Sequence, residues 1–277
     1  MIAGVVVLYN PEEDYINNIN SYIEDIDLLY VIDNSSKKNI IPKSKKIKYI
    51  YNNENLGVAK ALNMAANLAI KNNYKWLLTM DQDTKINKNV IKEMKKYIET
   101  HNTSKDSIIV PWHNTKLDVT KSKDKIDYPL VVMTSGNLVN LDIYQKLGGY
   151  NEDYFIDGID MEYCLKSKKN GYRVVRLNNI EIDHNLGDIS YHTFLGKKYM
   201  CSNHNYIRLY YMNRNYRYIK EKYYDIDPDY CEILTHIKLN IFKIIMFEND
   251  KYRKIRNIFR GIIDYKKGIV GKYRFKN

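Results

Sequence analysis

The strongest constraint on the fold is a regular alternation of short apolar runs and helical patterns along the first half of the chain. The run Ala3–Tyr9 is apolar almost throughout, as expected of a strand buried on both faces of a sheet. In Val58–Lys71, apolar residues recur at helical spacing instead. This alternation predicts an α/β fold with a mostly parallel sheet covered by helices. Further expected strands are Leu28–Ile32, Ile47–Tyr51 and Trp76–Met80, and further expected helices are Tyr15–Asp25 and Val90–Thr100.

The second half of the chain changes character. After a charged stretch that begins at Lys121, we expect strand-like sequence at Leu130–Leu141, a helix at Asp160–Asn170 and a strand at Tyr172–Leu177. From about residue 203 the sequence predicts helices rich in Tyr, Arg and Lys. We therefore expect an α/β domain over residues 1–202 and a C-terminal helical region over residues 203–277.

Charge and cysteine content restrict the partners and the compartment. The net charge of +11 predicts anionic partners, such as nucleotides, phospholipid head groups or nucleic acid. Cys164, Cys201 and Cys231 are far apart and odd in number, which favours a reducing compartment over a disulfide framework. No stretch reaches the ~20 apolar residues of a spanning helix. We expect a cytoplasmic protein, either soluble or peripheral on a membrane.

Polar clusters follow three of the expected strands. They are Tyr9-Asn10, Asp33-Asn34 and Asp81-Gln82-Asp83. Because ligands bind at the carboxyl ends of parallel strands, these clusters are expected to meet in one site.

Asp81 and Asp83 lie two residues apart, directly after an apolar strand. At a strand end this spacing lets two carboxylates bind one hard divalent cation, whose open positions accept diphosphate oxygens. A turn or a helix cap is the alternative interpretation.

Two other segments suit a nucleotide. Asp33 can accept the imide N–H of a uracil or thymine base, although an Asx-turn explains it as well. Asn55 and Gly57 open the helix that contains Lys60 and Asn63, and a helix N-terminus favours an anion. This segment matches neither the dinucleotide fingerprint nor the P-loop.

Three carboxylates, Asp157, Asp160 and Glu162, fall within six residues ahead of and inside an expected helix. Crowded carboxylates raise one another's pKa, which suits a general base for an alcohol nucleophile. Stabilisation of the helix N-terminus is the alternative.

Three basic candidates follow. His184 can ligate a metal or bind a diphosphate, but a lone histidine is more often structural. Arg208 and Arg214 suit phosphate, and an exposed basic face explains them about as well.

The ordered set of motifs resembles the GT-A glycosyltransferases of family 2, and specifically their bacterial rhamnosyltransferase-like branch. The resemblance extends from Val5 to about Asn215. It rests on Val7-Leu8-Tyr9-Asn10, Ile32-Asp33-Asn34-Ser35, Asn55-Leu56-Gly57 to Asn63, Asp81-Gln82-Asp83, Thr134-Ser135-Gly136-Asn137, Phe155-Ile156-Asp157 to Glu162, His184-Asn185-Leu186-Gly187-Asp188, and Tyr210-Tyr211 to Arg214-Asn215.

The resemblance implies an inverting transfer by single displacement, with Mn²⁺ or Mg²⁺ as cofactor. It makes residues 1–202 the nucleotide-sugar-binding and catalytic domain. It implies that Asp160 is the base, with Asp157 or Glu162 able to share that role, and that Asp83, Asp81 and His184 hold the metal. The donor-binding residues it implies, together with the strand-end and basic candidates above, are Tyr9, Asn10, Asp33, Asn55, Gly57, Lys60, Asn63, Asp81, Gln82, Arg208 and Arg214.

Three details of the sequence depart from the family pattern or restrict the reaction. Ile159 stands where many members carry Glu, and Lys60 with Asn63 replaces a commoner Arg-Asn ending. The processive QxxRW signature is absent, since the only tryptophans are Trp76 and Trp112. One sugar per encounter is therefore expected.

The resemblance also implies the substrate classes. The donor is L-rhamnose on a thymidine diphosphate, or else another hexose on a uridine diphosphate, and the acceptor is a glycan or lipid-linked glycan of cell-surface polysaccharide synthesis. A nucleotidyltransferase would need a Gly-rich loop after the first strand, which Tyr9-Asn10-Pro11 is not. A nucleic-acid-binding protein without catalysis is the rival from another class, and we expect no nucleic-acid partner.

The C-terminal sequence predicts a basic amphipathic helix. Such a helix can lie on the anionic inner face of a plasma membrane, pack on its own domain with a solvated basic face, or form a homodimer. Its apolar residues are Ile255, Ile258, Phe259, Ile262 and Ile263, and its basic residues are Lys251, Arg253, Lys254, Arg256 and Arg260.

Overall fold

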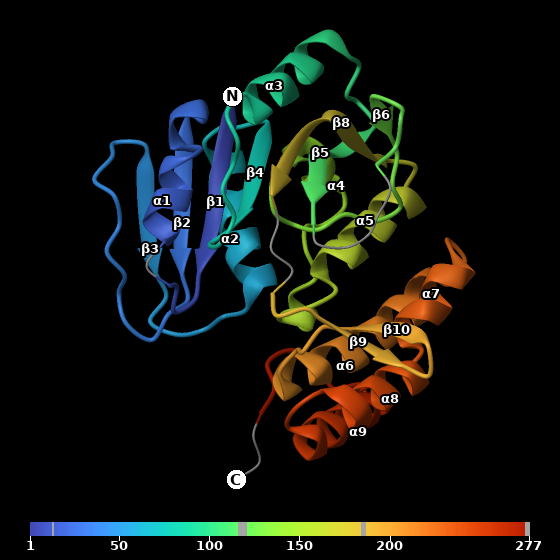
Figure 1. Cartoon of the computed structure of the whole chain (residues 1–277). Coiled ribbons are helices and arrows are strands. Elements are labelled where there is room, and N and C mark those ends of the chain that lie inside the picture. The colour runs from blue at the N-terminus through green and yellow to red at the C-terminus, as the bar shows by residue number, and fades with distance from the viewer. Residues whose placement is uncertain (13, 116–120, 184–186, 275–277) are drawn as a thin grey trace. The chain divides into compact units, whose positions relative to one another are not determined.

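The computed structural model describes residues 1–12, 14–115, 121–183 and 187–274 (Figure 1). The chain forms two compact units. Unit 1 comprises Met1–Asn151 and Asp160–Asn185, and unit 2 comprises Glu152–Ile159 and Leu186–Asn277. The division expected from the sequence, after residue 202, falls inside unit 2, and a catalytic domain over residues 1–202 stays a prediction.

The described part of unit 1 is built on an eight-stranded sheet in the order β3-β2-β1-β4-β7-β5-β8-β6. Neighbouring strands among β1 to β4 run parallel, as do β5 and β8, whereas β7 and β6 run antiparallel to their neighbours. The predicted α/β fold with a mostly parallel sheet is confirmed. The strands are β1 (Ile2–Leu8), β2 (Leu28–Asp33), β3 (Ile47–Tyr51), β4 (Trp76–Asp81), β5 (Asp106–Asn114), β6 (Ile126–Asp127), β7 (Asn137–Asn140) and β8 (Arg173–Asp183).

Helices flank this sheet, and two of them have the predicted bounds. These are α2 (Val58–Lys71) and α3 (Val90–Thr100). The alanines of α2 are fully buried, which follows from the apolar spacing in the sequence. The other helices of this region are α1 (Tyr15–Asn20), α4 (Leu141–Lys146) and α5 (Ile159–Lys169), with a short 3₁₀ turn at Ile23–Asp25, and a second 3₁₀ turn at Glu152–Tyr154 belongs to unit 2.

Two predicted elements are shorter in the structure. The helix expected over Tyr15–Asp25 ends at Asn20, and the hydroxyl of Ser21 bonds to the Asn18 carbonyl at 2.6 Å. A side chain that engages the backbone in this way offers an alternative to the helical ladder. The strand expected over Leu130–Leu141 is limited to β7, because Gly136 takes a left-handed φ of 77° before it and Asn140 caps α4 after it.

Unit 2 contains a hairpin and four helices in its described part. The hairpin pairs β9 (Ser190–Phe194) with β10 (Lys197–Cys201) and was not predicted. Leu195 and Gly196 both have positive φ, as a two-residue hairpin turn requires. The helices are α6 (Tyr206–Tyr223), α7 (Pro228–Thr235), α8 (Lys238–Phe247) and α9 (Lys251–Lys266), in agreement with the helical region expected from about residue 203.

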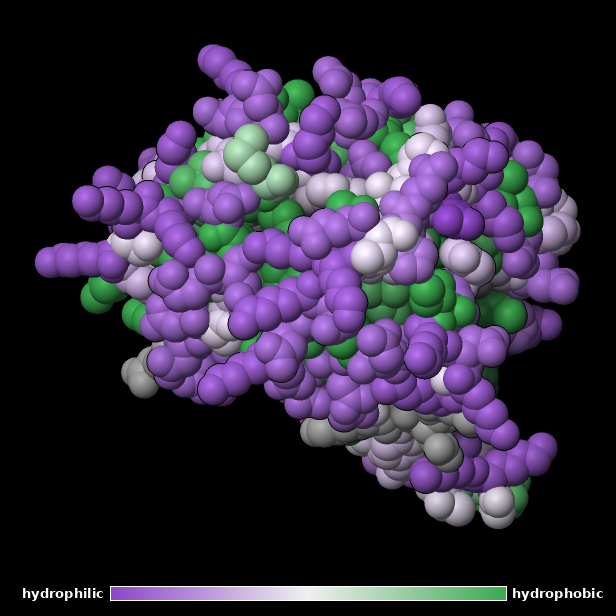
Figure 2. Space-filling view, turned by 90° about the horizontal axis from the view of Figure 1, so that it is seen from above, coloured by the Kyte–Doolittle hydropathy of each residue, from purple (hydrophilic) through white to green (hydrophobic). Residues whose placement is uncertain are grey.

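The surface is largely polar on the face drawn in Figure 2. Hydrophilic side chains predominate there, and hydrophobic residues emerge in small areas between them. Within the described ranges, no helix combines the length and the apolar character needed to cross a bilayer.

Candidate active site

Three strand ends meet at the carboxyl edge of the parallel strands. β1 lies between β2 and β4, with Leu8 opposite Asp33 and Val7 opposite Asp81. Tyr9, Asp33 and Asp81 therefore come from three adjacent strands, as the sequence predicts. The Tyr9 side chain is 51% exposed and lies at the surface of this edge.

The loop that follows β4 is fixed to its neighbours by hydrogen bonds. The Gln82 side chain accepts a hydrogen bond from the Tyr9 backbone nitrogen at 2.8 Å, and the Gln82 carbonyl accepts one from Asn18 at 3.0 Å. The Asp81 backbone nitrogen donates to the Ser135 hydroxyl at 3.1 Å. In this structure the Gln82 side chain thus orders the end of β1, while its predicted contact with a donor stays a prediction.

The two aspartates of this loop differ in exposure. Asp81 is half-buried at the end of β4, and Asp83 is exposed. Both supply carboxylate oxygens, the donors that Mg²⁺ and Mn²⁺ prefer. Within the described ranges, no group of three His, Cys, Asp or Glu residues could hold a metal ion. The two carboxylates are suitable donors for a divalent cation, but they are fewer than the three residues of such a group.

Asp33 is fully buried and is the centre of a hydrogen-bond network. Its Oδ1 accepts from the Ser35 nitrogen at 2.9 Å, and its Oδ2 accepts from the Tyr49 hydroxyl at 2.6 Å and from Asn39 Nδ2 at 2.9 Å. Burial by itself raises the pKa of Asp33, but hydrogen bonds from Tyr49, Ser35 and Asn39 outweigh it and lower the pKa below its usual value. Asp33 is thereby an ionised anchor for the loop after β2.

The loops after β1 and β2 are joined directly. The Asn10 nitrogen donates to the Ser35 hydroxyl at 2.7 Å, and Asn10 Oδ1 accepts from the Ser36 nitrogen at 3.3 Å. Asn10 itself takes a left-handed φ of 42°, a conformation that asparagine tolerates better than most residues. The exposed surface beside Tyr9 is therefore a defined polar platform.

The segment before α2 has the predicted turn. The Asn55 side chain accepts a hydrogen bond from the Gly57 nitrogen at 2.9 Å, and Gly57 has a φ of 88° that few residues other than glycine adopt. Lys60 is exposed in the first turn of the helix. Asn63 bonds instead to both backbone polar groups of Tyr150 at 3.0 Å and to the Tyr144 hydroxyl. In this structure Asn63 fixes the loop ahead of α5.

Two of the three clustered carboxylates lie on α5, in unit 1. Glu162 is fully buried and pairs with Lys166 at 3.2 Å. Asp160 is partly exposed in the first turn of the helix, where its Oδ1 accepts from the Met161 nitrogen at 2.9 Å. Of these two carboxylates, only that of Asp160 lies at the surface.

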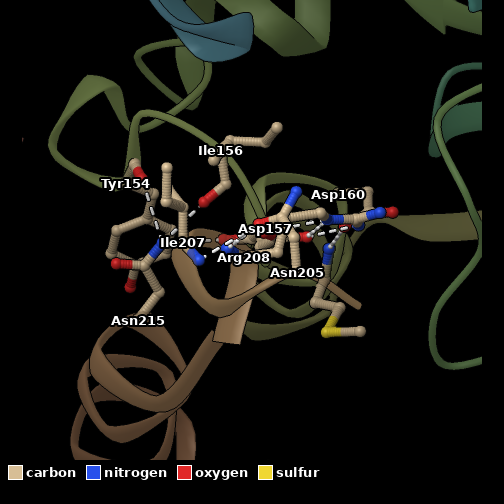
Figure 3. A network of polar contacts seen from close by, with 9 residues as sticks. Tyr154, Ile156, Asp157, Asp160, Asn205, Ile207, Arg208 and Asn215 are labelled. Atoms are coloured by element: carbon tan, nitrogen blue, oxygen red, sulfur yellow. Dashed lines mark hydrogen bonds and ion pairs between the residues drawn. The ribbon is translucent and has the colours of Figure 1, made fainter. Parts of the chain in front are cut away.

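The third carboxylate, Asp157, belongs to unit 2 and is held by Arg208 of α6 (Figure 3). Arg208 Nη2 lies 2.6 Å from Asp157 Oδ1, and the Asp157 side chain is only 6% exposed. Asn215 Nδ2 donates to the carbonyls of Tyr154, Ile156 and Asp157 at 3.0, 2.8 and 2.8 Å. These bonds fix a segment in which Asp157 has a left-handed φ of 62°.

The other basic candidates are not equally available. Arg214 is fully buried, and its guanidinium donates to the carbonyls of Asp153 and Gly271 at 3.1 and 2.8 Å. The predicted contact of Arg214 with donor phosphate does not fit this burial. His184 lies outside the described residues.

Some residues of the site were not identified from the sequence. Tyr49 and Asn39 hold Asp33, and His113 Nε2 lies 2.7 Å from the carbonyl of Ser135. Their types carry no signal in the sequence, because the register of β2 against β3 places Tyr49 and the pairing of β5 with β7 places His113.

Comparison with known proteins gives a family that agrees with this arrangement of the site. Residues 5–158 match the family described as "Glycosyl transferase family 2". The chain is also similar to the dTDP-rhamnosyl transferase RfbF of Shigella flexneri, with 26% identity over 211 residues that cover 68% of this chain and 70% of that protein.

Solved structures share the fold at low sequence identity. S. aureus TarS 1–349 in complex with UDP-GlcNAc aligns with a TM-score of 0.58 and 13% identity over 99% of this chain and 93% of that one. GalNAc-T7 with UDP, GalNAc and Mn²⁺ aligns with a TM-score of 0.58 and 12% identity over 97% of this chain and 57% of that one. At these identities the likeness establishes the fold, which is the GT-A fold expected from the resemblance.

Proposed function

Because this chain belongs to glycosyl transferase family 2 and is a nucleotide-sugar glycosyltransferase, we propose that it transfers one sugar per encounter with inversion, assisted by a divalent cation. The observation that carries the proposal is the placement of Asp33 and Asp81 on either side of the end of β1. Asp33 anchors the loop that we expect at the nucleobase of the donor. Asp81 leads into the loop that we expect at its diphosphate. Family membership also sets aside the rival interpretation as a nucleic-acid-binding protein without catalysis.

The base of the donor binds at the platform formed by Tyr9, Asn10 and the loop after β2. Tyr9 is exposed and offers a ring for stacking. Asp33 is buried and accepts a hydrogen bond from the Ser35 nitrogen, so it acts on the nucleobase either through the remaining Oδ1 lone pair or by fixing the loop after β2. Asn55 and Gly57 at the start of α2, with exposed Lys60, add positive potential for the diphosphate.

Asp83 would hold Mn²⁺ or Mg²⁺, and Asp81 and His184 are proposed as further ligands. Such a cation, when bound, neutralises charge that develops on the leaving diphosphate. The hydrogen bonds that Tyr9, Asn18 and Ser135 make to this loop keep its carboxylates in place before the donor binds. The chain thus supplies a preorganised anionic loop.

Asp160 is the general base of the reaction. It accepts the proton of the acceptor hydroxyl as that oxygen forms a bond to the anomeric carbon, while the bond from that carbon to the diphosphate oxygen breaks. Attack from the face opposite the leaving group inverts the anomeric configuration. Glu162 is buried against Lys166 and Asp157 is enclosed by Arg208, so exposure favours Asp160 among the three carboxylates.

The donor is dTDP-L-rhamnose, and the acceptor is a glycan or lipid-linked glycan of cell-surface polysaccharide synthesis. The similarity to a dTDP-rhamnosyl transferase supports this choice. A UDP-hexose is the second candidate, because a protein of the same fold is found in complex with UDP-GlcNAc.

A thermal-shift screen separates these donors. The purified protein is heated with dTDP, UDP, dTDP-rhamnose or UDP-GlcNAc, each with and without Mn²⁺. A ligand that binds only the native state stabilises it by mass action and so raises Tm. At a ligand concentration of one hundred times Kd, the free energy of unfolding rises by roughly 2.7 kcal/mol. We expect the largest shift with dTDP-rhamnose and Mn²⁺. If UDP-GlcNAc gave a shift and dTDP-rhamnose gave none, a UDP-hexose would replace dTDP-rhamnose as the proposed donor.

Two matched variants assign the roles. Asp83→Asn should abolish the Mn²⁺-dependent part of the donor shift, whereas Asp160→Asn should keep that shift and lose turnover of the same donor. The exposed Asp142→Asn, in the first turn of α4, is the control and should behave like the wild type. Donor turnover that survives both chelation and Asp83→Asn would refute the metal-dependent mechanism.

A further inference from the structure

The exposed large hydrophobic side chains of the described residues are concentrated on unit 2. All of them except Met1, Tyr9, Ile40 and Tyr128 belong to this unit, although unit 2 is the smaller of the two. Exposed apolar side chains that lie next to one another mark an interaction site, whereas scattered ones do not. The side chains of the helix α9 indicate the chemistry of the partner that such a site would bind.

One side of α9 is fully committed to its own unit. Ile258 is completely buried, and a Cβ added at Gly261 would lie 2.4 Å from the carbonyl oxygen of Tyr210, so the helix packs closely on α6. Lys254 is buried and pairs with Glu248 at 2.7 Å. The helix is therefore held in a fixed rotation about its own axis.

The opposite side of α9 carries a narrow exposed stripe. Tyr252, Arg256, Phe259 and Ile263 follow one another at steps of four, three and four residues, which places them along one side of a helix. Tyr252 is 76% exposed, Phe259 46% and Ile263 48%. The apolar residues of the predicted amphipathic helix thus divide, with Ile255, Ile258 and Ile262 packed inward and Phe259 and Ile263 facing outward.

Cations surround this stripe. In the described residues from 251 to 274, Asp264 is the one carboxylate, and it already accepts a hydrogen bond from the Tyr210 hydroxyl at 2.8 Å. The exposed basic residues of the same range are Lys251, Arg253, Arg256, Lys266, Lys267, Lys272 and Arg274. The surface thus combines apolar side chains with a strong positive charge.

We propose that this face of α9 is a peripheral docking site for a bilayer that contains anionic lipids. Basic residues of such a helix contact the head groups, and aromatic and aliphatic side chains enter the boundary between head groups and acyl chains. The interaction goes beyond the transfer reaction and does not depend on the identity of the donor. It would hold the enzyme at the surface where lipid-linked molecules are found.

Charge and composition favour a bilayer over two other partners. A second copy of the chain, docked through the same face about a two-fold axis, would bring the cationic residues of both helices together without compensation. Nucleic acid would satisfy the cations but would leave the stripe of Phe259 and Ile263 against a charged backbone. An anionic bilayer satisfies both kinds of side chain.

Vesicle co-sedimentation tests the proposal with the full chain. The probes are vesicles of phosphatidylcholine alone and vesicles of phosphatidylcholine mixed with phosphatidylglycerol. We expect binding only to the anionic vesicles. The double variant Phe259→Ser with Ile263→Ser and the double variant Arg256→Gln with Lys267→Gln should each weaken that binding by about tenfold or more.

Matched controls lie on unit 1. Ile40 is 79% exposed, and Lys92 and Lys96 are exposed on α3, so Ile40→Ser and Lys92→Gln with Lys96→Gln change the same residue types elsewhere. These controls should bind vesicles like the wild type. Equal loss of binding in the Lys92/Lys96 and the Arg256/Lys267 variants would mean that net charge alone acts, and would overturn the assignment to α9.

Two further measurements test whether a loss of vesicle binding arises from unfolding or from a change in oligomeric state. All variants should keep the wild-type Tm and the donor-induced thermal shift, since every altered side chain is exposed or half-exposed. Light scattering gives the oligomeric state. If the wild type were a dimer that Phe259→Ser with Ile263→Ser made monomeric, and no vesicle bound, the face would be a subunit interface and the proposal would be wrong.

Discussion

Arg208 encloses the carboxylate of Asp157, with Nη2 of the guanidinium 2.6 Å from Oδ1 of the acid. The arginine side chain is 44% exposed and the aspartate side chain only 6%, so the cation covers the anion from the solvent side. A buried and paired carboxylate is a weaker candidate for the proposed general base than a carboxylate at the surface. We therefore expect Asp157 to play a structural role that is distinct from the proposed role of Asp160, three residues later.

Replacement of each carboxylate by its amide tests this separation. Asp160→Asn should lower kcat by about 10²–10⁴-fold, the usual contribution of a general base. Asp157→Asn keeps an oxygen that can accept from Arg208 and should retain turnover within about tenfold. The measurement is turnover of the nucleotide-sugar donor that gives the largest thermal shift.

The stability of Asp157→Asn serves as the internal control of that experiment. Loss of a buried charge pair should lower the free energy of unfolding by about 1–3 kcal/mol, while donor binding persists. If Asp157→Asn were as inactive as Asp160→Asn at full donor occupancy, Asp157 would belong to the reacting groups.

The hydroxyl of Tyr49 is expected to stabilise the protein through Asp33. Tyr49→Phe removes the 2.6 Å hydrogen bond to a buried carboxylate and should lower the free energy of unfolding at neutral pH by about 1.5–3 kcal/mol. Tyr51→Phe is the control, because that hydroxyl bonds to Ser36 and Asn53 at the exposed surface. Urea titration of the three proteins measures the difference.

The effect of Tyr49→Phe on the free energy of unfolding should depend on pH. The pKa of Asp33 is lowered below its usual 3.8 in the folded protein, so the unfolded chain takes up the proton first as the pH falls. The stabilisation is complete above pH 3.8 and is lost as the pH falls below that value through the folded pKa. The difference between wild type and Tyr49→Phe should therefore shrink on acidification, and a difference that grows would contradict the assignment.

Gly261 is expected to be essential for the packing of α9 on α6. An added Cβ would lie 2.4 Å from the Tyr210 carbonyl oxygen, so Gly261→Ala forces the helices apart despite its better helix propensity. We expect a loss of about 1–3 kcal/mol in the free energy of unfolding. The exposed Lys266→Ala on the same helix should leave stability within about 0.5 kcal/mol, as measured by chemical denaturation.

The cysteine thiols should be inert in the native protein. Cys164, Cys201 and Cys231 are all buried and free, and burial raises the pKa of Cys164 to about 12. A thiol reacts as its thiolate, so all three should resist a thiol reagent until the chain unfolds. Rapid modification of a thiol without unfolding would show that the native state opens locally at that residue.

The sequence alone predicted much of the architecture of unit 1, but it predicted no strand at Asp106–Asn114, where β5 lies inside the sheet. The strand at Ile47–Tyr51 and the helices at Val58–Lys71 and Val90–Thr100 have the predicted bounds, because hydrophobic periodicity and burial arise from the same side chains. It was also sufficient to place Asp33 and Asp81 at the same edge, since parallel strands bring their carboxyl ends together. Periodicity did not predict the hairpin of β9 and β10, whose strands are short and only partly buried.

The tertiary structure decided which of the candidate side chains are available for chemistry. Arg208 and Arg214 lie on the same helix and are alike in sequence, yet one is exposed against Asp157 and the other is fully buried among carbonyl groups. Asp157, Asp160 and Glu162 differ in the same way. A residue's type and spacing determine what it can do, whereas its burial and its partners depend on segments far away in the chain and become known only when those segments are packed together.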